Sequence, residues 1–218
     1  MKIAAAAFAV ILFCSVTSVA AQTPGPQFGL KLGPTFSNVS VDPEDPDADT
    51  GMRWGIGGGG FVTLPLNPRI SLQFEGLFTP KGSKTSGAAG TDFEGLEGQL
   101  ALDYVEFPVL LRFDGSRTGR QSFNFFVGPA FGFNTSARNE IVVDGDLFDN
   151  GVSDNIGDEV SNFDVGLVFG AGMDFGRYFV ADVRYSWGFI NVNDVDDDDT
   201  VIKNRAFTIL AGIRFGRR

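Results

Sequence analysis

Five charged residues could form a catalytic centre, because they occur inside segments that are otherwise rich in apolar residues. They are Glu75, Glu106, Arg112, Asp182 and Arg184. Paired carboxylates can serve as the acid and the base of glycosidases and aspartic proteases. Whether these residues act in that way depends on the elements that hold them.

The composition excludes several enzyme classes. The 218 residues contain no histidine, which rules out Ser-His-Asp hydrolases, Cys-His proteases and zinc sites built on imidazole. The formal net charge of −10 argues against a nucleic-acid partner, because phosphate contacts need Lys and Arg. We therefore expect no cofactor and no enzyme activity, and the charged residues need another explanation.

One glycine motif has the spacing of a nucleotide site. Gly55, Gly57 and Gly60 match GxGxxG, but Phe61–Leu66 continues as a strand where a nucleotide site needs a helix. We interpret these glycines as small residues at a place where strands crowd.

Acidic residues near both ends of the chain could bind cations. Asp45, Asp47 and Asp49 have the spacing that begins a calcium loop, but Ile56 stands where an EF-hand has its Glu. A weak candidate cation rim combines them with a second acidic run: Asp45, Asp47, Asp49, Asp194, Asp196, Asp197, Asp198 and Asp199. Ca²⁺ favours oxygen ligands in flexible geometry, so we expect at most weak binding. The alternative is a hydrated rim that faces lipopolysaccharide.

The N-terminal segment, residues 1–21, is predicted to be a secretory signal peptide. Lys2 is followed by twelve consecutive apolar residues, 3–14, and then by small residues up to Ala21. Twelve residues are too few for a spanning helix, which needs ~20. Cleavage after Ala21 leaves 22–218 as the mature barrel domain, and cleavage one residue earlier fits nearly as well.

From Phe28 onward, apolar residues recur at every second position in eight stretches. Phe28, Leu30 and Leu32 begin the pattern, and small or charged residues alternate with them. The other stretches lie within 53–66, 70–79, 104–113, 123–134, 162–175, 179–188 and 207–215. The small and polar face fits a narrow lumen, so the Phe/Val/Leu face would meet lipid. The chain is therefore predicted to be all-β, an eight-stranded antiparallel up-and-down transmembrane β-barrel.

The connections alternate between long and short, which supports the same fold. Four long loops, at 40–51, 82–98, 138–160 and 190–203, hold 20 of the 27 acidic residues. The short connections are Asn67-Pro68, 114–121 and Gly176-Arg177. Long outer loops and short periplasmic turns are typical of the outer membrane of a diderm bacterium. Pro129, inside the fifth stretch, removes a ladder donor, so we expect a bulge there.

In this barrel the five charged residues face the lumen. A barrel of eight strands is only wide enough to be filled by its own side chains, and buried charges must pair. We therefore interpret the five as a lumen ionic network, with Arg184 bridging Glu75 and Glu106, and not as a catalytic site. Barrel lipases, palmitoyl-transferases and omptins use a His, which this chain lacks.

Four segments resemble motifs of the PorT-like outer-membrane β-barrel family: Phe28–Val39, Leu72–Gly82, Tyr104–Phe113 and Asn162–Gly172. The ending Arg205–Phe215 is similar to that family's last strand, although three more residues follow it. The resemblance covers essentially the mature chain and implies an OmpA-like eight-stranded barrel. Members mostly have no assigned activity, and some relatives are tied to protein secretion or gliding. No catalytic motif carries over.

The sequence thus predicts a structural or surface-interaction role without catalysis. Its expected surroundings are outer-membrane lipid and lipopolysaccharide, with an envelope or secretion-system protein as a conceivable partner, and the protein is expected to be a monomer. The alternative is a narrow gated pore or a component of a protein-secretion system. A soluble exported barrel that carries a ligand is a third and less favoured interpretation.

Overall fold

The computed structural model describes residues 25–42, 49–86, 96–118, 121–143, 153–155, 160–192 and 200–216. Within these residues the chain forms nine strands: β1 (Gln27–Asp42), β2 (Asp49–Pro65), β3 (Ile70–Ser86), β4 (Leu96–Thr118), β5 (Gln121–Val143), β6 (Ser153–Asn155), β7 (Phe163–Phe175), β8 (Phe179–Gly188) and β9 (Val201–Gly216). No helix in this part of the chain has the length and apolar character needed to cross a membrane.

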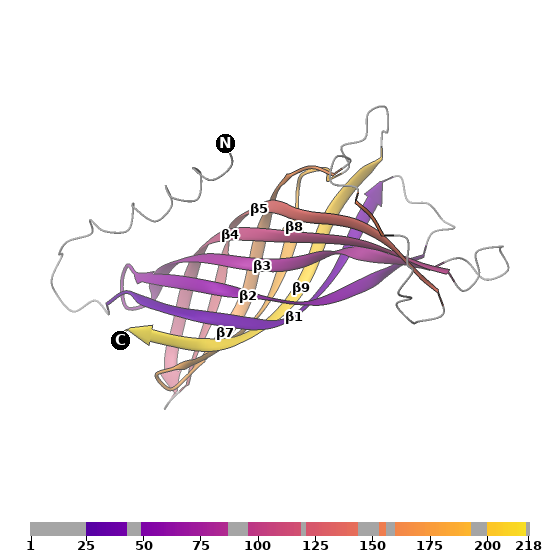
Figure 1. The fold of residues 1–218 in the computed structure, drawn as a ribbon. Helices are drawn as coiled ribbons and strands as arrows, with labels where there is room; N and C mark the ends of the chain where they lie inside the picture. Colours follow the sequence, from indigo (N-terminus) through magenta and orange to yellow (C-terminus); the bar gives the residue numbers. More distant parts are fainter. Residues whose placement is uncertain are drawn as a thin grey trace, which may run out of the picture.

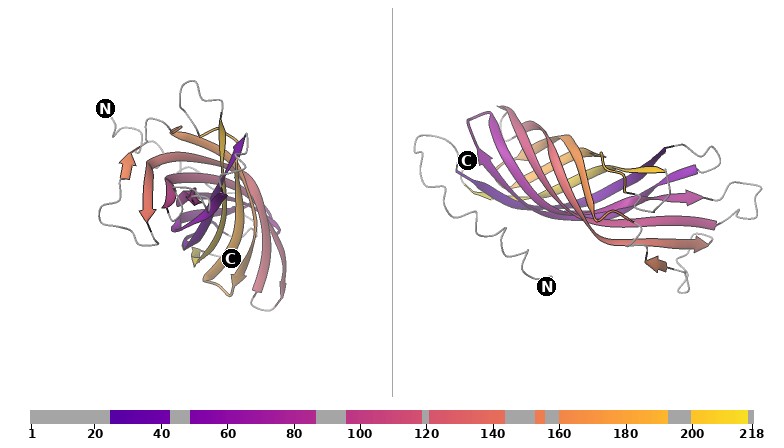
Figure 2. Two further views of the ribbon diagram at one scale, coloured as in Figure 1. Left: turned by 90° about the vertical axis from the view of Figure 1, so that its right-hand side faces the viewer. Right: turned by 90° about the horizontal axis from the view of Figure 1, so that it is seen from above.

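Eight of the described strands close into an antiparallel barrel. Neighbours along the chain pair with each other, β5 pairs onward with β7, and β9 returns to β1 from Gln27↔Gly216 to Asp42↔Val201. Figure 1 shows the strands winding around one axis, and Figure 2 gives two further views. β6 is a short addition to β5, beside Arg138–Glu140. The predicted eight-stranded up-and-down barrel is confirmed.

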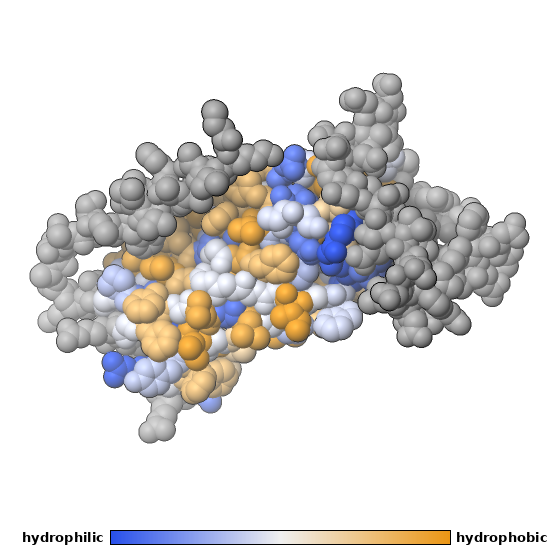
Figure 3. All heavy atoms as spheres, viewed as in Figure 1, coloured by the Kyte–Doolittle hydropathy of each residue, from blue (hydrophilic) through white to orange (hydrophobic). Residues whose placement is uncertain are grey.

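The period-two pattern sorts side chains between the two faces of the wall. On β1, Leu30 and Leu32 are 61% and 68% exposed, whereas Lys31 between them is 5% exposed. The same alternation on the other strands places large apolar side chains outside and mostly polar ones inside. Figure 3 shows apolar residues, in orange, spread over the outer face of β1–β3. An apolar surface of this extent is suited to the hydrocarbon of a membrane.

Two tight turns lie at the end of the barrel where β1 begins and β9 ends. In the turn 66–69, Asn67 Oδ1 accepts hydrogen bonds from the backbone N–H groups of Arg69 and Ile70, both at 2.8 Å. In the turn between β7 and β8, Gly176 has a φ of 63°, a left-handed conformation that glycine adopts without steric cost. These are the two tight turns that the sequence predicted.

At the opposite end, the strands run further than the sequence predicted. β4 and β5 have 23 residues each and pair as far as Leu96↔Val143, inside the predicted loops 82–98 and 138–160. The predicted strand ends were wrong because they followed the apolar pattern of the lipid-facing wall. A backbone ladder can continue beyond the membrane without that pattern, since its hydrogen bonds do not depend on the side chains.

The bulge expected at Pro129 does not occur in the described ladder. The register between β5 and β7 is unchanged from Gln121↔Phe175 to Phe133↔Phe163. Proline removes one hydrogen bond but adds no residue, so it does not by itself shift the register. The β4–β5 register shifts instead at two places in β4, between Asp103 and Tyr104 and between Asp114 and Arg117.

Several strand glycines lie where a neighbouring strand leaves no room for a side chain. A Cβ added at Gly59 would lie 2.0 Å from a backbone oxygen of β3, and one at Gly57 would lie 2.7 Å from another. At Gly55 an added Cβ would lie 2.7 Å from a proline side chain of β3. At Gly60 the nearest atom would be 3.7 Å away, which is an ordinary contact. The GxGxxG motif is therefore part of a crowded strand, and of its three glycines only Gly60 has space for a side chain.

Gly59 and Gly60 are neighbours on β2 and provide a matched test of this crowding. Gly59→Ala should lower the free energy of unfolding by roughly 1–3 kcal/mol, because the new methyl group meets the backbone of β3. Gly60→Ala should change it by less than about 0.5 kcal/mol. Urea unfolding in detergent micelles, followed by the shift in gel mobility, measures both. Equal losses would contradict this account of the wall.

Candidate functional site in the lumen

The inward faces of β1, β3 and β8 bring four charged side chains together. Lys31 Nζ lies 2.9 Å from Glu75 Oε1 and 2.7 Å from Asp182 Oδ2. Arg184 Nε lies 2.8 Å from Asp182 Oδ1, and the Arg184 Nη atoms contact both Glu75 oxygens. We call these four residues the central cluster. Each cation contacts both carboxylates, so the central cluster is closed and neutral.

An amide and two aromatic rings surround the central cluster. Gln73 Nε2 donates a hydrogen bond to Glu75 Oε1 at 2.6 Å. The ring centroids of Phe61 and Phe126 lie 4.8 Å from the ammonium of the cluster lysine and 5.2 Å from the guanidinium of its arginine. These distances are typical of cation–π contacts. The four charges are buried, and each is compensated by an opposite charge and by neighbouring groups.

A second group, the outer cluster, lies toward the end of the barrel where β4 and β5 extend. Lys81 Nζ lies 2.7 Å from Glu106 Oε1 and 3.2 Å from Asp164 Oδ2. Asn204 Nδ2 donates to Asp164 Oδ2 at 3.0 Å and to Tyr104 OH at 3.2 Å. One cation here faces two carboxylates, and Asp164 Oδ1 has no hydrogen-bond partner in the described part of the chain.

A third group, the inner cluster, lies toward the tight turns. Asp174 Oδ2 accepts hydrogen bonds from Arg112 Nη2 at 2.6 Å and from Arg214 Nη1 at 2.7 Å. Arg112 also donates to Asp114 Oδ1, from Nε at 3.0 Å and from Nη2 at 2.7 Å. Ser71 Oγ donates to Asp114 Oδ2 at 3.1 Å. The inner cluster thus joins β4, β7 and β9 across the barrel.

The structure places all five sequence-predicted residues inside the barrel, but it divides them among the three clusters. These residues are Glu75, Glu106, Arg112, Asp182 and Arg184, and all are buried. The predicted bridge from Arg184 to Glu106 is not formed among the described residues, because Lys81 pairs with Glu106. The prediction failed because β3 was expected to end near Thr79, whereas it continues to Ser86 and brings Lys81 into the lumen.

The other partners were present in the sequence, and the prediction left them out. Lys31, Asp164, Asp174 and Arg214 stand on the polar face of their strands and are buried in the lumen. The same alternation that marked the predicted five therefore marks these four as well. Alternation identifies the members of a lumen network, but it does not say which of them meet.

The candidate cation rim lies outside the described residues, apart from the backbone of Asp49 at the start of β2. In the part of the chain that the structure describes, no group of three or more His, Cys, Asp or Glu side chains could hold a metal ion. Weak calcium binding at the rim stays a prediction.

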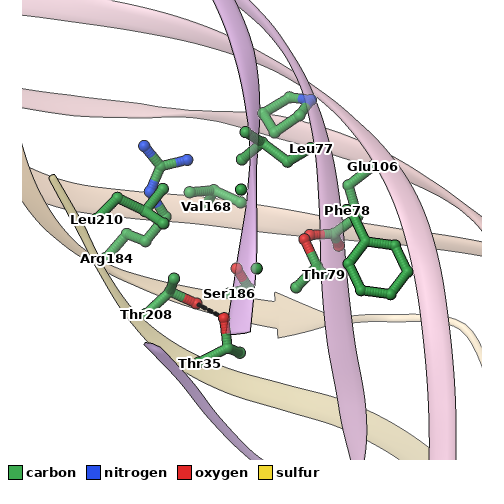
Figure 4. A pocket seen from close by; sticks show the side chains of 13 residues that line it. Thr35, Leu77, Phe78, Thr79, Glu106, Val168, Arg184, Ser186, Thr208 and Leu210 are labelled. Carbon is green, nitrogen blue, oxygen red and sulfur yellow. Dashed lines mark hydrogen bonds between the residues drawn. The ribbon is translucent and has the colours of Figure 1, made fainter. Parts of the chain in front are cut away.

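In the described part of the lumen, the cavities between the clusters are small. Two cavities in the lumen have volumes of about 10 Å³ each, close to the space that a single water molecule needs. Figure 4 shows one of them, which is lined by Glu106 of the outer cluster and Arg184 of the central cluster. Thr208 Oγ1 donates a hydrogen bond to Thr35 Oγ1 at 3.2 Å beside it. The cavity admits water but no larger solute.

An apolar cluster adjoins the outer cluster, because Tyr104 belongs to both. Its other buried members are Leu102, Ala137, Val160 and Val192. They come from β4, from β5 and from the segments that flank the β7–β8 hairpin. A second apolar cluster inside the barrel consists of Leu110, Phe126, Ala130 and Val168. The lumen is therefore filled by charge pairs and by apolar packing together.

The sequence matches the family described as outer membrane protein β-barrel domain over residues 20–194, well over half of the chain. The chain belongs to this family. As an outer-membrane β-barrel it resides in the outer membrane of a Gram-negative bacterium, which agrees with its closed ring and its apolar outer face.

Several solved outer-membrane proteins are similar to this barrel at low identity. Ail, the attachment invasion locus protein of Yersinia pestis, solved with the heparin analogue sucrose octasulfate, is 18% identical, with 88% of this chain and 99% of that chain covered and a TM-score of 0.40. OprG from Pseudomonas aeruginosa is 12% identical, with 88% and 97% covered and a TM-score of 0.49. Neisserial surface protein A is 12% identical, with 87% and 96% covered and a TM-score of 0.44. No curated protein matches the sequence.

The central cluster predicts a large cost for removing one of its charges. Arg184→Ala leaves Glu75 and Asp182 buried with one cation between them, so the free energy of unfolding should fall by roughly 3–5 kcal/mol. Arg177→Ala, in the exposed turn between β7 and β8, should have little effect. Urea unfolding of both variants in the same detergent makes the comparison. If the two variants lost equal stability, the central cluster would not be holding the barrel together.

Proposed function

We propose that this protein is a closed, monomeric outer-membrane barrel with a structural or surface-interaction role and no catalytic activity. The observation that carries the proposal is the filled lumen, in which three ion clusters and two apolar clusters leave cavities of about 10 Å³. A barrel of eight strands has room for side chains and little else. Binding is therefore left to the two ends of the barrel and to its lipid-facing wall.

The inward carboxylates do not favour acid–base catalysis. A catalytic carboxylate must reach the atom of a substrate that it protonates or deprotonates. Glu75 and Asp182 are each held between two cations, and Glu106 is paired with Lys81. A cavity that holds about one water molecule gives a substrate no access to them.

The finer assignment to the PorT-like family rests on the sequence segments that resemble its motifs, and we propose it on that ground. Under this assignment the partner is a protein of the cell envelope, bound at one end of a barrel that lies among lipid and lipopolysaccharide. Some PorT-like relatives are tied to secretion or gliding machinery. Genes for a secretion machinery beside the gene of this protein would favour such a partner over a purely structural role.

Planar lipid bilayers test the closed lumen. The purified protein should give no steady single-channel conductance, because the lumen charges are paired and the free space is small. A sixteen-stranded porin, inserted under the same conditions, checks that open channels are detected. A stable open state would contradict the proposal and would favour the alternative, a narrow gated pore.

We also propose that residues 1–21 are a signal peptide that is removed during export. The intact mass of protein from isolated outer membranes should correspond to a chain that begins at Gln22, or at Ala21 for the neighbouring cleavage site. A mass that retains Met1 and the apolar segment after it would rule out cleavage.

A further inference from the structure

The outer wall of the barrel contains an apolar groove about 620 Å³ in volume, which the filled lumen does not explain. It crosses β1–β4 and β9, and its lining includes Phe28, Leu30, Gly60, Phe74, Phe107 and Phe215. Phe28 and Phe215 adjoin the strand ends Gln27 and Gly216. The groove therefore lies in the half of the wall that is nearer the tight turns, which is the periplasmic half of the membrane.

Two facing glycines form the floor of the groove. Gly60 of β2 and Gly76 of β3 are partners in the ladder, and both line the groove. A Cβ would fit at either position, because the nearest atoms would be 3.7 Å away at Gly60 and 3.8 Å away at Gly76. Neither has a positive φ. In contrast to Gly59, neither close packing nor backbone conformation requires them, and their effect is to leave a depression between the flanking rings.

We propose that this groove binds an acyl chain of a phospholipid from the periplasmic leaflet. The groove opens on the side of the wall that faces the hydrocarbon of the membrane, and that hydrocarbon consists of acyl chains. An acyl chain that lies over the two glycines makes dispersion contacts with the flanking aromatic rings. It also fills the hollow, which a lipid that lay along the outside of the rings would leave empty. Figure 3 shows this face, with paler residues between the orange apolar side chains.

Charge at the periplasmic end of the same wall complements the head group of such a lipid. Arg69 is exposed in the turn 66–69, between β2 and β3. Phe74 lies five positions further along the chain, which is at most about 16 Å of strand. One leaflet of the hydrocarbon core is about 15 Å thick. A phosphate paired with the Arg69 guanidinium therefore places its acyl chain at the depth of the groove.

A second copy of the barrel fits the groove less well. Stable protein interfaces bury about 800 Å² on each partner, over a broad and complementary face. This feature is a hollow between aromatic rings that stand out from the wall, since Phe28 is 56% and Phe215 is 43% exposed. A convex barrel wall would rest on those rings and leave the glycine floor uncovered. A flexible chain reaches the floor.

Photocrosslinking to the reconstituted protein tests the proposal. The probe is phosphatidylglycerol with a diazirine on its acyl chain, in vesicles of phosphatidylglycerol and phosphatidylethanolamine. Crosslinks should fall on Leu30, Phe74 and Phe107 at least about fivefold more often than on Phe169 and Val183 of the β7–β8 wall, a ratio that corresponds to about 1 kcal/mol.

Matched variants separate the groove from the rest of the wall. Gly60→Leu and Gly76→Leu fill the groove and should remove the preference. Ala171→Leu enlarges a lipid-facing residue of β7 and should leave it unchanged. Gel mobility checks that each variant folds, and Gly60→Ala with Gly76→Ala gives a milder filling that the wall has space for. Arg69→Gln leaves the wall intact and should lower labelling of the groove by roughly two- to threefold, through loss of the phosphate contact.

Three results would overturn the proposal. The first is equal labelling of the groove and of the β7–β8 wall in the folded wild type. The second is full labelling of the groove in folded Gly60→Leu and Gly76→Leu proteins. The third is crosslinking between two copies of the barrel through the groove, which would make a second copy its occupant. Labelling of the groove that does not respond to Arg69→Gln would overturn the assignment of the phosphate to this arginine.

Discussion

The width of an eight-stranded ring is the constraint on which the rest of this structure depends. Because the lumen is narrow, side chains from opposite strands must meet inside it. Arg184 of β8 contacts Glu75 of β3, which lies four strands away around the ring and 109 positions away in the sequence. Burying an unpaired charge there would cost several kcal/mol of folding free energy, so each inward charge requires a partner of opposite charge. Closure of the ring and formation of the central cluster are therefore coupled, because closure brings β1, β3 and β8 to the positions from which these side chains meet.

The same narrowness explains why glycines and large aromatic rings occur together on the inner face. The ring of Phe61 lies against the lysine of the central cluster, and an added Cβ at Gly29 would come within 2.6 Å of that ring. Phe126 lies against the cluster arginine, and Gly170 stands in the same relation to it, also at 2.6 Å. Glycines thus provide the space in which aromatic rings cover the buried cations. The wall and the lumen network are one packing arrangement.

Alternation along the chain was sufficient to predict the fold. The two-residue period, the number of strands and the tight turns can all be read from which residues occupy successive positions. Alternation also marked most of the charged residues that face the lumen, including Lys31, Asp164, Asp174 and Arg214. It could not predict pairing, because tilt and stagger between strands set the height of each side chain. Lys81 shows a second limit of prediction from the sequence. It lies beyond the apolar part of β3, so the membrane pattern gave no reason to place it in the barrel. Phe61 and Phe126 show a third, because they are large apolar residues on the polar face.

The three clusters are not equally compensated, and this bears on how the protein could act. In the central cluster each cation contacts both carboxylates. In the outer cluster Lys81 faces both Glu106 and Asp164, and Asp164 Oδ1 lacks a partner among the described residues. A change at the end where β4 and β5 extend would therefore disturb the outer cluster first and leave the central cluster closed. An event at that surface cannot open a path through the barrel unless it also separates the central charges, which costs several kcal/mol. Under the proposed surface-interaction role, binding at that end would thus be energetically separate from opening of the lumen, and the role would need no pore.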